Sequence, residues 1–292
     1  MKLEKKLSQT TCFNLFLIFL SCFIFLLQGK EDSDPSILVT IAPYEFFVKK
    51  IAEDTVKVHI MVPAGASAHT YEPTPKQTIQ ATKANIWFRM GEPFEDRIIP
   101  VLKSYNSLFT VVDLRDGVPL IKTDPLHSCC HAHSSDPHFW LSARLAHIQA
   151  DTIASTLITL RPEHASLYRE NLKKFHQELD ELDKRIQKIL EPMINRNILV
   201  SHPAYAYFCR DYNIIQYSIE FEGKDPTPQQ LTKILNLAKS LKFKTIFIQK
   251  QYSSKGARLI AENIGAQLIT LDPYSERYIE TMIEIAQAFA HG

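Results

Sequence analysis

Four side chains that can ligate a metal recur along the chain at similar intervals: His69, His138, His202 and Asp272. Subtracting successive numbers gives separations of 69, 64 and 70 residues. Three neutral imidazoles and one carboxylate form a tetrahedral set that suits zinc, with ligand bonds of about 2.0–2.2 Å. Mixed nitrogen and oxygen ligation also leaves Mn²⁺ or Fe²⁺ open. These residue types predict a divalent-metal site, provided that the fold brings the four together.

Their positions at expected strand ends favour such a meeting. His69 follows a mostly apolar run at residues 56–62, whereas His202 and Asp272 stand directly after two later apolar runs. Open α/β sheets bind ligands beyond the carboxyl ends of their strands. If two sheets point these ends at one cleft, the four residues converge there. Each could instead be an ordinary turn residue, since Asp and His are frequent at the ends of strands.

The elements that would hold this site alternate between strand and helix in both halves of the chain. Such alternation predicts parallel sheets with helices on both faces. We expect an N-terminal α/β lobe at residues 36–160 and a C-terminal α/β lobe at 195–292. The first lobe has expected strands at residues 37–41, 56–62, 85–90 and 108–114, and the second at residues 197–201, 214–219, 245–249 and 267–271.

The most regular stretch, residues 161–194, predicts one long linking helix. Its apolar residues recur in steps of three and four: Leu172, Phe175, Leu179, Leu182, Ile186, Ile189 and Met193. A dimeric coiled coil would need more heptads than this stretch contains. The interpretation is an intramolecular helix whose apolar face packs along both lobes and holds them in a fixed relation. The predicted fold class is therefore α/β, with two lobes joined by one long rigid helix.

Composition and the N-terminus indicate an exported globular protein. The chain has 292 residues and a formal net charge of +1, so nothing favours nucleic acid as a partner. Residues 1–29 have the pattern of a signal peptide, because lysines precede a thirteen-residue apolar stretch at 15–27. An uncleaved membrane anchor or a lipidated Cys22 is the alternative. We expect a periplasmic protein, either released or anchored through this segment.

Residues 122–137 lack periodicity and contain a cluster of soft ligands: His127, Cys129, Cys130, His131 and His133. Three cysteines lie beyond the leader, and an odd number argues against a disulfide framework. This loop is interpreted as an auxiliary, weaker metal site, with a plain polar loop as the alternative.

Several motifs resemble the zinc/manganese solute-binding proteins of ABC importers, of the ZnuA/TroA type. The resemblance runs from about Leu38 to the end of the chain, and the motifs occur in the family's order. They are residues 40–44 (TIAPY), 63–75 (PAGASAHTYEPTP), 136–142 (DPHFWLS), 201–208 (SHPAYAYF), 222–228 (EGKDPTP) and 271–273 (LDP).

The resemblance implies a binding component, not an enzyme, that captures a metal ion and passes it to a membrane permease with its ATPase subunit. It implies that His69, His138, His202 and Asp272 bind the metal. We also expect the protein to be a monomer. Within the family, His at the place of His202 goes with zinc and Glu with manganese, so His202 favours zinc. The His/Cys loop resembles a shortened form of the His-rich loop of zinc-type members.

Two other functions compete with metal import. Residues 131–138 (HAHSSDPH) resemble the metal-binding run of metallo-β-lactamase-like zinc hydrolases, but the Asp and the last His are displaced. A hydrolytic zinc also needs an open coordination position and a nearby base, whereas four protein ligands would close the shell. The second alternative is an adhesin that keeps the importer fold, because fold alone does not determine function.

Overall fold

The structure, a computed structural model, describes residues 34–122, 135–220 and 226–292. The expected leader at 1–29 and the ligands of the His/Cys loop at 127–133 lie outside the described residues. Ser36–Gly292 forms one compact unit.

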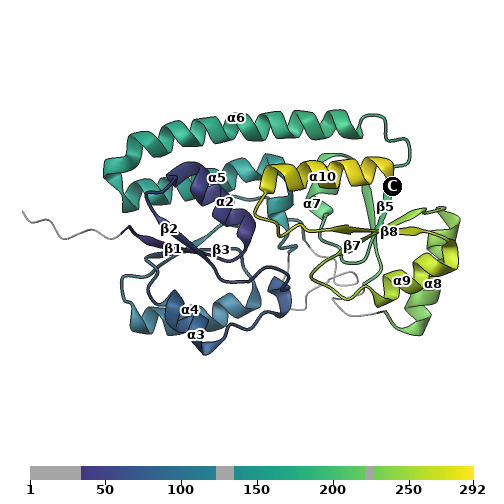
Figure 1. Ribbon diagram of the computed structural model, residues 1–292, viewed down its shortest axis with the longest axis horizontal. Coiled ribbons are helices and arrows are strands. Elements are labelled where there is room, and N and C mark those ends of the chain that lie inside the picture. Colours follow the sequence, from purple (N-terminus) through teal and green to yellow (C-terminus); the bar gives the residue numbers. More distant parts are fainter. Residues whose placement is uncertain (1–33, 123–134, 221–225) are drawn as a thin grey trace, which may run out of the picture. The chain divides into compact units, whose positions relative to one another are not determined.

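The first lobe is built on a parallel sheet with strand order β2-β1-β3-β4. Its central strand β1 is almost fully buried, as expected for a strand covered on both faces. Figure 1 shows α2 and α5 on one side of this sheet and α3 and α4 on the other. The elements are β1 (Ser36–Val39), α2 (Ala42–Ala52), β2 (Lys57–Ile60), α3 (Pro75–Ala81), β3 (Ile86–Arg89), α4 (Pro93–Tyr105), β4 (Thr110–Asp113) and α5 (Ala143–Leu160).

The second lobe repeats this plan with the strand order β6-β5-β7-β8, again all parallel. All five residues of β7 are buried. Gly265 ends α9 in the left-handed conformation (φ 69°), which glycine adopts readily at the end of a helix. The elements are β5 (Asn197–Val200), α7 (Ala206–Asp211), β6 (Ile215–Ser218), α8 (Pro228–Ser240), β7 (Thr245–Gln249), α9 (Lys255–Ile264), β8 (Gln267–Leu271) and α10 (Tyr278–His291).

The predicted linking helix is α6 (Ala165–Leu190), preceded by the short 3₁₀ helix η3 (Pro162–His164). It packs against α2 and α5 of the first lobe and against α10 of the second (Figure 1). Four of the seven predicted apolar positions are buried: Phe175, Leu179, Leu182 and Ile186. The predicted fold class is confirmed. Among the described helices, none is long and apolar enough to cross a membrane.

A buried aromatic cluster joins the two lobes beside the predicted ligands. Phe47 meets Phe175 and Tyr278 edge-on, with ring centroids 5.1 Å and 4.9 Å apart. The Trp140 indole N–H donates to the Pro273 carbonyl at 3.0 Å, and the Tyr278 hydroxyl donates to the Trp140 carbonyl at 2.8 Å. Burying each large aromatic side chain stabilises the fold by about 1.5–3 kcal/mol. This packing fixes the backbone next to the predicted ligands His138 and Asp272.

Candidate metal centre

Three of the four predicted ligands come together. The Nε2 atom of His138 lies 3.1 Å from Nε2 of His69 and 3.3 Å from Nε2 of His202. One ligand atom from each ring lies within 4.8 Å of the other two. Two ligands on a tetrahedral zinc, with bonds of about 2.05 Å, are separated by about 3.3 Å. The imidazole spacing therefore matches that of zinc ligands.

His69 is presented by the loop that follows β2. The chain turns at Gly65 and forms the short 3₁₀ helix η1 (Ala68–Thr70). The Nδ1 atom of His69 lies 3.0 Å from each carboxylate oxygen of Glu92, a buried residue in the loop after β3. The carboxylate can accept the Nδ1–H proton, which leaves Nε2 as the nitrogen that can bind a metal.

His138 is held by its near neighbour Asp136. The Oδ1 atom of Asp136 accepts hydrogen bonds from both the backbone N–H and the Nδ1–H of His138, each at 2.8 Å. One carboxylate oxygen thus fixes the backbone turn and the ring orientation together. The chain then enters η2 (Phe139–Leu141), whose Trp140 is anchored to the second lobe as described above.

His202 stands directly beyond β5, and its outer nitrogen is also held by a carboxylate. Nδ1 lies 2.7 Å from Oε2 of Glu220, which follows the neighbouring strand β6. Tyr252 stacks on the His202 ring, with centroids 3.9 Å apart and planes 11° apart. The Tyr252 hydroxyl lies 3.1 Å from the hydroxyl of Ser67 in the loop before His69. Tyr252 therefore covers the imidazoles from the second lobe and contacts the first.

The same arrangement repeats at all three histidines: a carboxylate on Nδ1 and an Nε2 lone pair that faces the other two rings. Carboxylate–histidine pairs of this kind orient metal ligands and make the imidazole more basic. Three lone pairs directed at one point repel one another, and a cation between them removes that repulsion. The arrangement is suited to hold a divalent ion.

The centre is nearly closed to solvent. His138 and His202 are buried, and the His69 side chain is 9% exposed. Burial lowers the pKa of His202 well below the usual value, and the neighbouring His138 and His69 lower it further. The imidazole of His202 is therefore neutral, as a metal ligand must be.

A second buried carboxylate, Glu95, holds the loop that carries Glu92. It accepts hydrogen bonds from three successive backbone N–H groups, those of Met90 (3.1 Å), Gly91 (2.6 Å) and Glu92 (2.8 Å). It also accepts hydrogen bonds from the Thr40 hydroxyl and from the Nε–H of Arg89. Burial raises the pKa of Glu95 to about 7, against the opposing effect of these donors.

The fourth predicted ligand, Asp272, is not part of the histidine group among the described residues. Its Oδ1 atom accepts a hydrogen bond from Gln251 at 2.6 Å, and the Lys250 ammonium lies 3.9 Å from Oδ2. Together with the turn at residues 63–66, Asp272 lines a cavity of about 300 Å³. Asp272 therefore shares a cavity wall with the loop that leads to His69.

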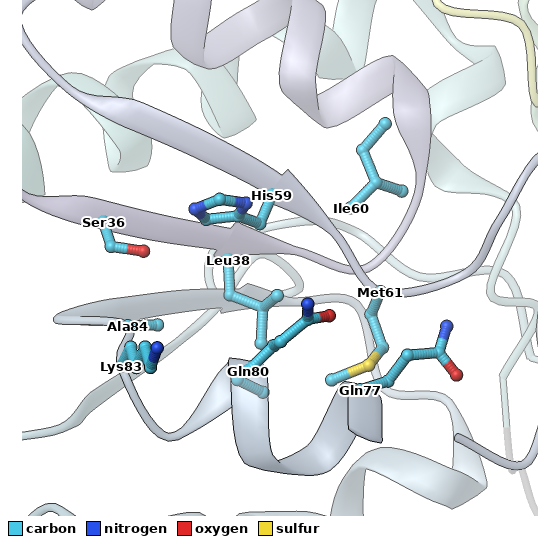
Figure 2. Close-up of a pocket in the computed structure, with 10 residues that line it drawn as sticks. Ser36, Leu38, His59, Ile60, Met61, Gln77, Gln80, Lys83 and Ala84 are labelled. Atoms are coloured by element: carbon cyan, nitrogen blue, oxygen red, sulfur yellow. The ribbon is translucent and has the colours of Figure 1, made fainter. Parts of the chain in front are cut away.

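Another cavity, of about 320 Å³, lies in the first lobe between the β1–β2 edge and α3 (Figure 2). His59 on β2 and Gln77 and Gln80 on α3 line it, but no carboxylate does. A single imidazole without acidic partners is a weak cation site. None of the predicted metal ligands lines this cavity.

Three residues at the centre were not predicted from the sequence: Glu92, Glu220 and Tyr252. Both carboxylates follow strands, Glu92 after β3 and Glu220 after β6. A search for acidic residues at strand ends, in addition to histidines, would have identified them. No comparable signal points to Tyr252, whose position depends on how the loop after β7 folds over the site.

Comparisons with known proteins agree with this geometry. A solved structure described as ZnuA superposes with a TM-score of 0.83 at 34% identity, covering 89% of this chain and 99% of that one. A relative from Chlamydia muridarum, whose description names metal binding, is 33% identical over 282 residues, covering 94% of this chain and 98% of the relative. The high-affinity zinc uptake system protein ZnuA of Bacillus subtilis is 27% identical over 270 residues, covering 88% and 85%.

Two α/β lobes with parallel sheets, spanned by one long helix, are the architecture of the metal-binding solute-binding proteins of ABC importers. The model of one family in this class, the periplasmic component A of zinc-uptake complexes, matches residues 37–292. The chain belongs to that family.

Zinc affinity is expected to fall as the pH drops below about 6.5, the ordinary histidine pKa, because each bound imidazole must be deprotonated. At His202 the lowered pKa delays proton competition to a lower pH. The same pKa shift affects the stability of the fold. Below about pH 6.5 the unfolded chain binds a proton at His202, whereas the folded protein does not, so the free energy of unfolding decreases as the pH falls below about 6.5 and has its full value above it. Competition titrations from about pH 7.5 to 5 measure the affinity, and a constant value across that range would exclude imidazole ligation.

Proposed function

We propose that this protein is the extracytoplasmic binding component of an ABC importer, which captures a divalent metal ion and delivers it to a permease driven by an ATPase subunit. Zinc is the favoured cargo, with Mn²⁺ or Fe²⁺ as alternatives. The protein would act as a monomer in the periplasm, exported by residues 1–29 and either released or anchored there. It would carry out no reaction of its own.

The convergence of the three imidazoles, each backed by a carboxylate, supports this proposal most directly. Three nitrogens favour zinc over the harder Mn²⁺ ion. We propose His69, His138 and His202 as ligands, with Asp272 as the fourth after it turns away from Gln251. Binding by residues from both lobes would let the permease distinguish the loaded from the empty protein.

The test is a metal-competition assay on the purified protein. Wild type and His202→Ala are incubated with equal concentrations of Zn²⁺, Mn²⁺ and Fe²⁺, desalted, and subjected to elemental analysis. We expect wild type to retain mainly zinc and His202→Ala to lose most of it. In parallel, zinc accumulation is measured in zinc-limited cells that have either protein as their sole binding component.

Equal metal content in wild type and His202→Ala would contradict the proposed metal site. Normal zinc binding together with unchanged zinc accumulation in cells that lack the protein would instead remove the proposed role in import. Hydrolysis of a β-lactam by the zinc-loaded wild type, but not by His202→Ala, would favour the hydrolase alternative. The two arms thus separate binding from transport.

A further inference from the structure

A second group of metal-ligating side chains lies on the seam between α5 and α6, outside the three-histidine centre. His147 and Asp151 are one turn apart on α5, and His176 and Asp180 are one turn apart on α6. Residues four apart share one face of a helix. The helices run antiparallel, so each histidine faces the aspartate of the other helix.

The contacts across this seam are reciprocal. His147 Nε2 lies 3.3 Å from Asp180 Oδ1, and His176 Nε2 lies 3.2 Å from Asp151 Oδ1. The two imidazole rings lie beside each other, with centroids 4.7 Å apart. Four ligand-bearing side chains from two helices therefore occupy one short stretch of the seam.

The electrostatics of the seam favour a divalent cation. Partial burial and the neighbouring His176 lower the pKa of His147, against the opposing effect of the nearby aspartates. In its neutral form His147 offers a lone pair to a metal ion. As metal ligands, two imidazoles and two carboxylates together carry a charge of about −2, which one divalent ion neutralises.

One nitrogen of the seam has no hydrogen-bond partner among the described residues. Nε2 of His176 is buried and has no hydrogen-bond partner, although a carboxylate oxygen of Asp151 lies 3.2 Å away. Within each His–Asp pair, the nitrogen–oxygen distance of 3.3 Å or 3.2 Å is close to the separation of about 3.3 Å between two ligands of a tetrahedral zinc. Nitrogen and oxygen atoms at this spacing can share one metal ion as ligands.

We propose that His147, Asp151, His176 and Asp180 form a second divalent-metal site that clamps α5 to α6. Two imidazoles and two carboxylates suit zinc and, more strongly, Cu²⁺, and do not suit Mg²⁺ or Ca²⁺. Among the described residues only the three-histidine group already has its ligand atoms within 4.8 Å. Metal binding at the seam therefore includes a rotation of these side chains, which are 26% to 63% exposed.

This site would bind more weakly than the interlobe centre and would exchange metal with solvent, because its side chains are partly exposed. A metal here would fix the linking helix to the first lobe, since α6 packs on α5 along this seam. The inference does not depend on the proposed function of the interlobe centre.

Calorimetric titration with Zn²⁺ tests the seam in the wild type and in the double variant His147→Ala/His176→Ala. The matched control is His59→Ala/His291→Ala, which removes two exposed imidazoles elsewhere. We expect the seam variant to lose one weaker zinc equivalent relative to wild type and control, while tight binding at the interlobe centre remains. Any zinc held by the His/Cys loop is common to all three proteins and cancels in the comparison.

Two further variants keep the test decisive. Asp151→Asn/Asp180→Asn preserves side-chain size, so it is expected to lose the same equivalent even if the alanine variant folds poorly. His202→Ala is expected to keep the seam equivalent, so failure of the interlobe site is distinguishable from failure at the seam. Identical zinc stoichiometry in wild type and both seam variants, or an equal loss in the control, would overturn the proposal.

Discussion

Replacing His138 by alanine is expected to weaken zinc binding by about 100- to 1,000-fold. A four-ligand zinc site binds with about 10–16 kcal/mol, so one ligand contributes about 3 kcal/mol on average. Each 1.4 kcal/mol changes affinity about tenfold. We choose His138 because its Nε2 atom is close to Nε2 of both other histidines, His69 (3.1 Å) and His202 (3.3 Å). Competition with a chromophoric zinc chelator measures the change.

Two comparison variants distinguish loss of a ligand from loss of its support. Glu220→Gln keeps an oxygen that can accept the His202 Nδ1–H, so we expect a decrease of about tenfold, at the lower end for residues that orient metal ligands. His59→Ala removes an exposed imidazole outside the three-histidine group and is expected to leave affinity unchanged. Wild-type affinity in His138→Ala, with an unaltered melting temperature of the metal-free protein, would show that His138 is not a ligand.

The architecture was predictable because its signals are local. Alternating strand and helix patterns predicted two parallel sheets, and the three- and four-residue spacing of Leu179, Leu182 and Ile186 predicted the linking helix. The helix is shorter than the predicted range of 161–194, since Pro162 starts a separate 3₁₀ turn before Ala165. Local patterns define the type of an element better than its ends.

The site was predictable in part, because strand ends of parallel sheets collect ligands. That rule predicted the positions of His69 and His202, and the family resemblance added His138. Asp272 follows β8 as the rule predicts, and its carboxylate accepts a hydrogen bond from Gln251 on the neighbouring loop, which the rule does not predict. Side-chain orientation depends on hydrogen bonds between loops, and no periodicity in the sequence records those bonds.

The carboxylates behind the histidines show the same limit. Glu92 and Glu220 are distant in sequence from the imidazoles that they hold, by 23 and 18 residues. Asp136, by contrast, is two residues from His138 and belongs to the same motif, residues 136–142, so the sequence shows the two partners together. A contact made through space is predictable only where the fold is already known, or where both partners share a motif.

Replacing Glu95 by alanine is expected to destabilise the protein by about 3–5 kcal/mol, although Glu95 touches no proposed ligand. Its carboxylate accepts from the backbone N–H groups of Met90, Gly91 and Glu92. A buried N–H group left without an acceptor costs about 1–3 kcal/mol. Total stabilities of about 5–15 kcal/mol make this a large fraction. Urea unfolding of the metal-free protein measures it.

Zinc binding should weaken in Glu95→Ala as well, because the loop that Glu95 holds also carries Glu92. Gly91 has a φ of 98° in this loop, and a side chain there would meet Arg115, so the chain has little freedom to find another packing. Loss of support for His69 through Glu92 is expected to reduce affinity by about tenfold or more, as for other residues behind metal ligands.

The destabilisation caused by Glu95→Ala is expected to depend on pH, because burial raises the pKa of the Glu95 carboxyl group. The folded-state pKa of about 7 exceeds the unfolded value of 4.5, so the folded protein keeps a proton that the unfolded chain releases. The contribution of Glu95 to the free energy of unfolding is therefore largest below about pH 4.5 and decreases as the pH rises to about 7. The urea midpoints of wild type and Glu95→Ala should differ more at about pH 5 than at about pH 8.

Asp96→Ala is the matched control for this prediction. Asp96 is the next residue along α4, but its side chain is 67% exposed and it pairs only with Arg89 in the structure described, at 2.7 Å. Exposed ion pairs contribute about 0–1 kcal/mol, so the expected loss is small. Equal destabilisation by the two substitutions, or a Glu95→Ala effect that grows with pH, would show that backbone support by a buried carboxyl is not what positions Glu92.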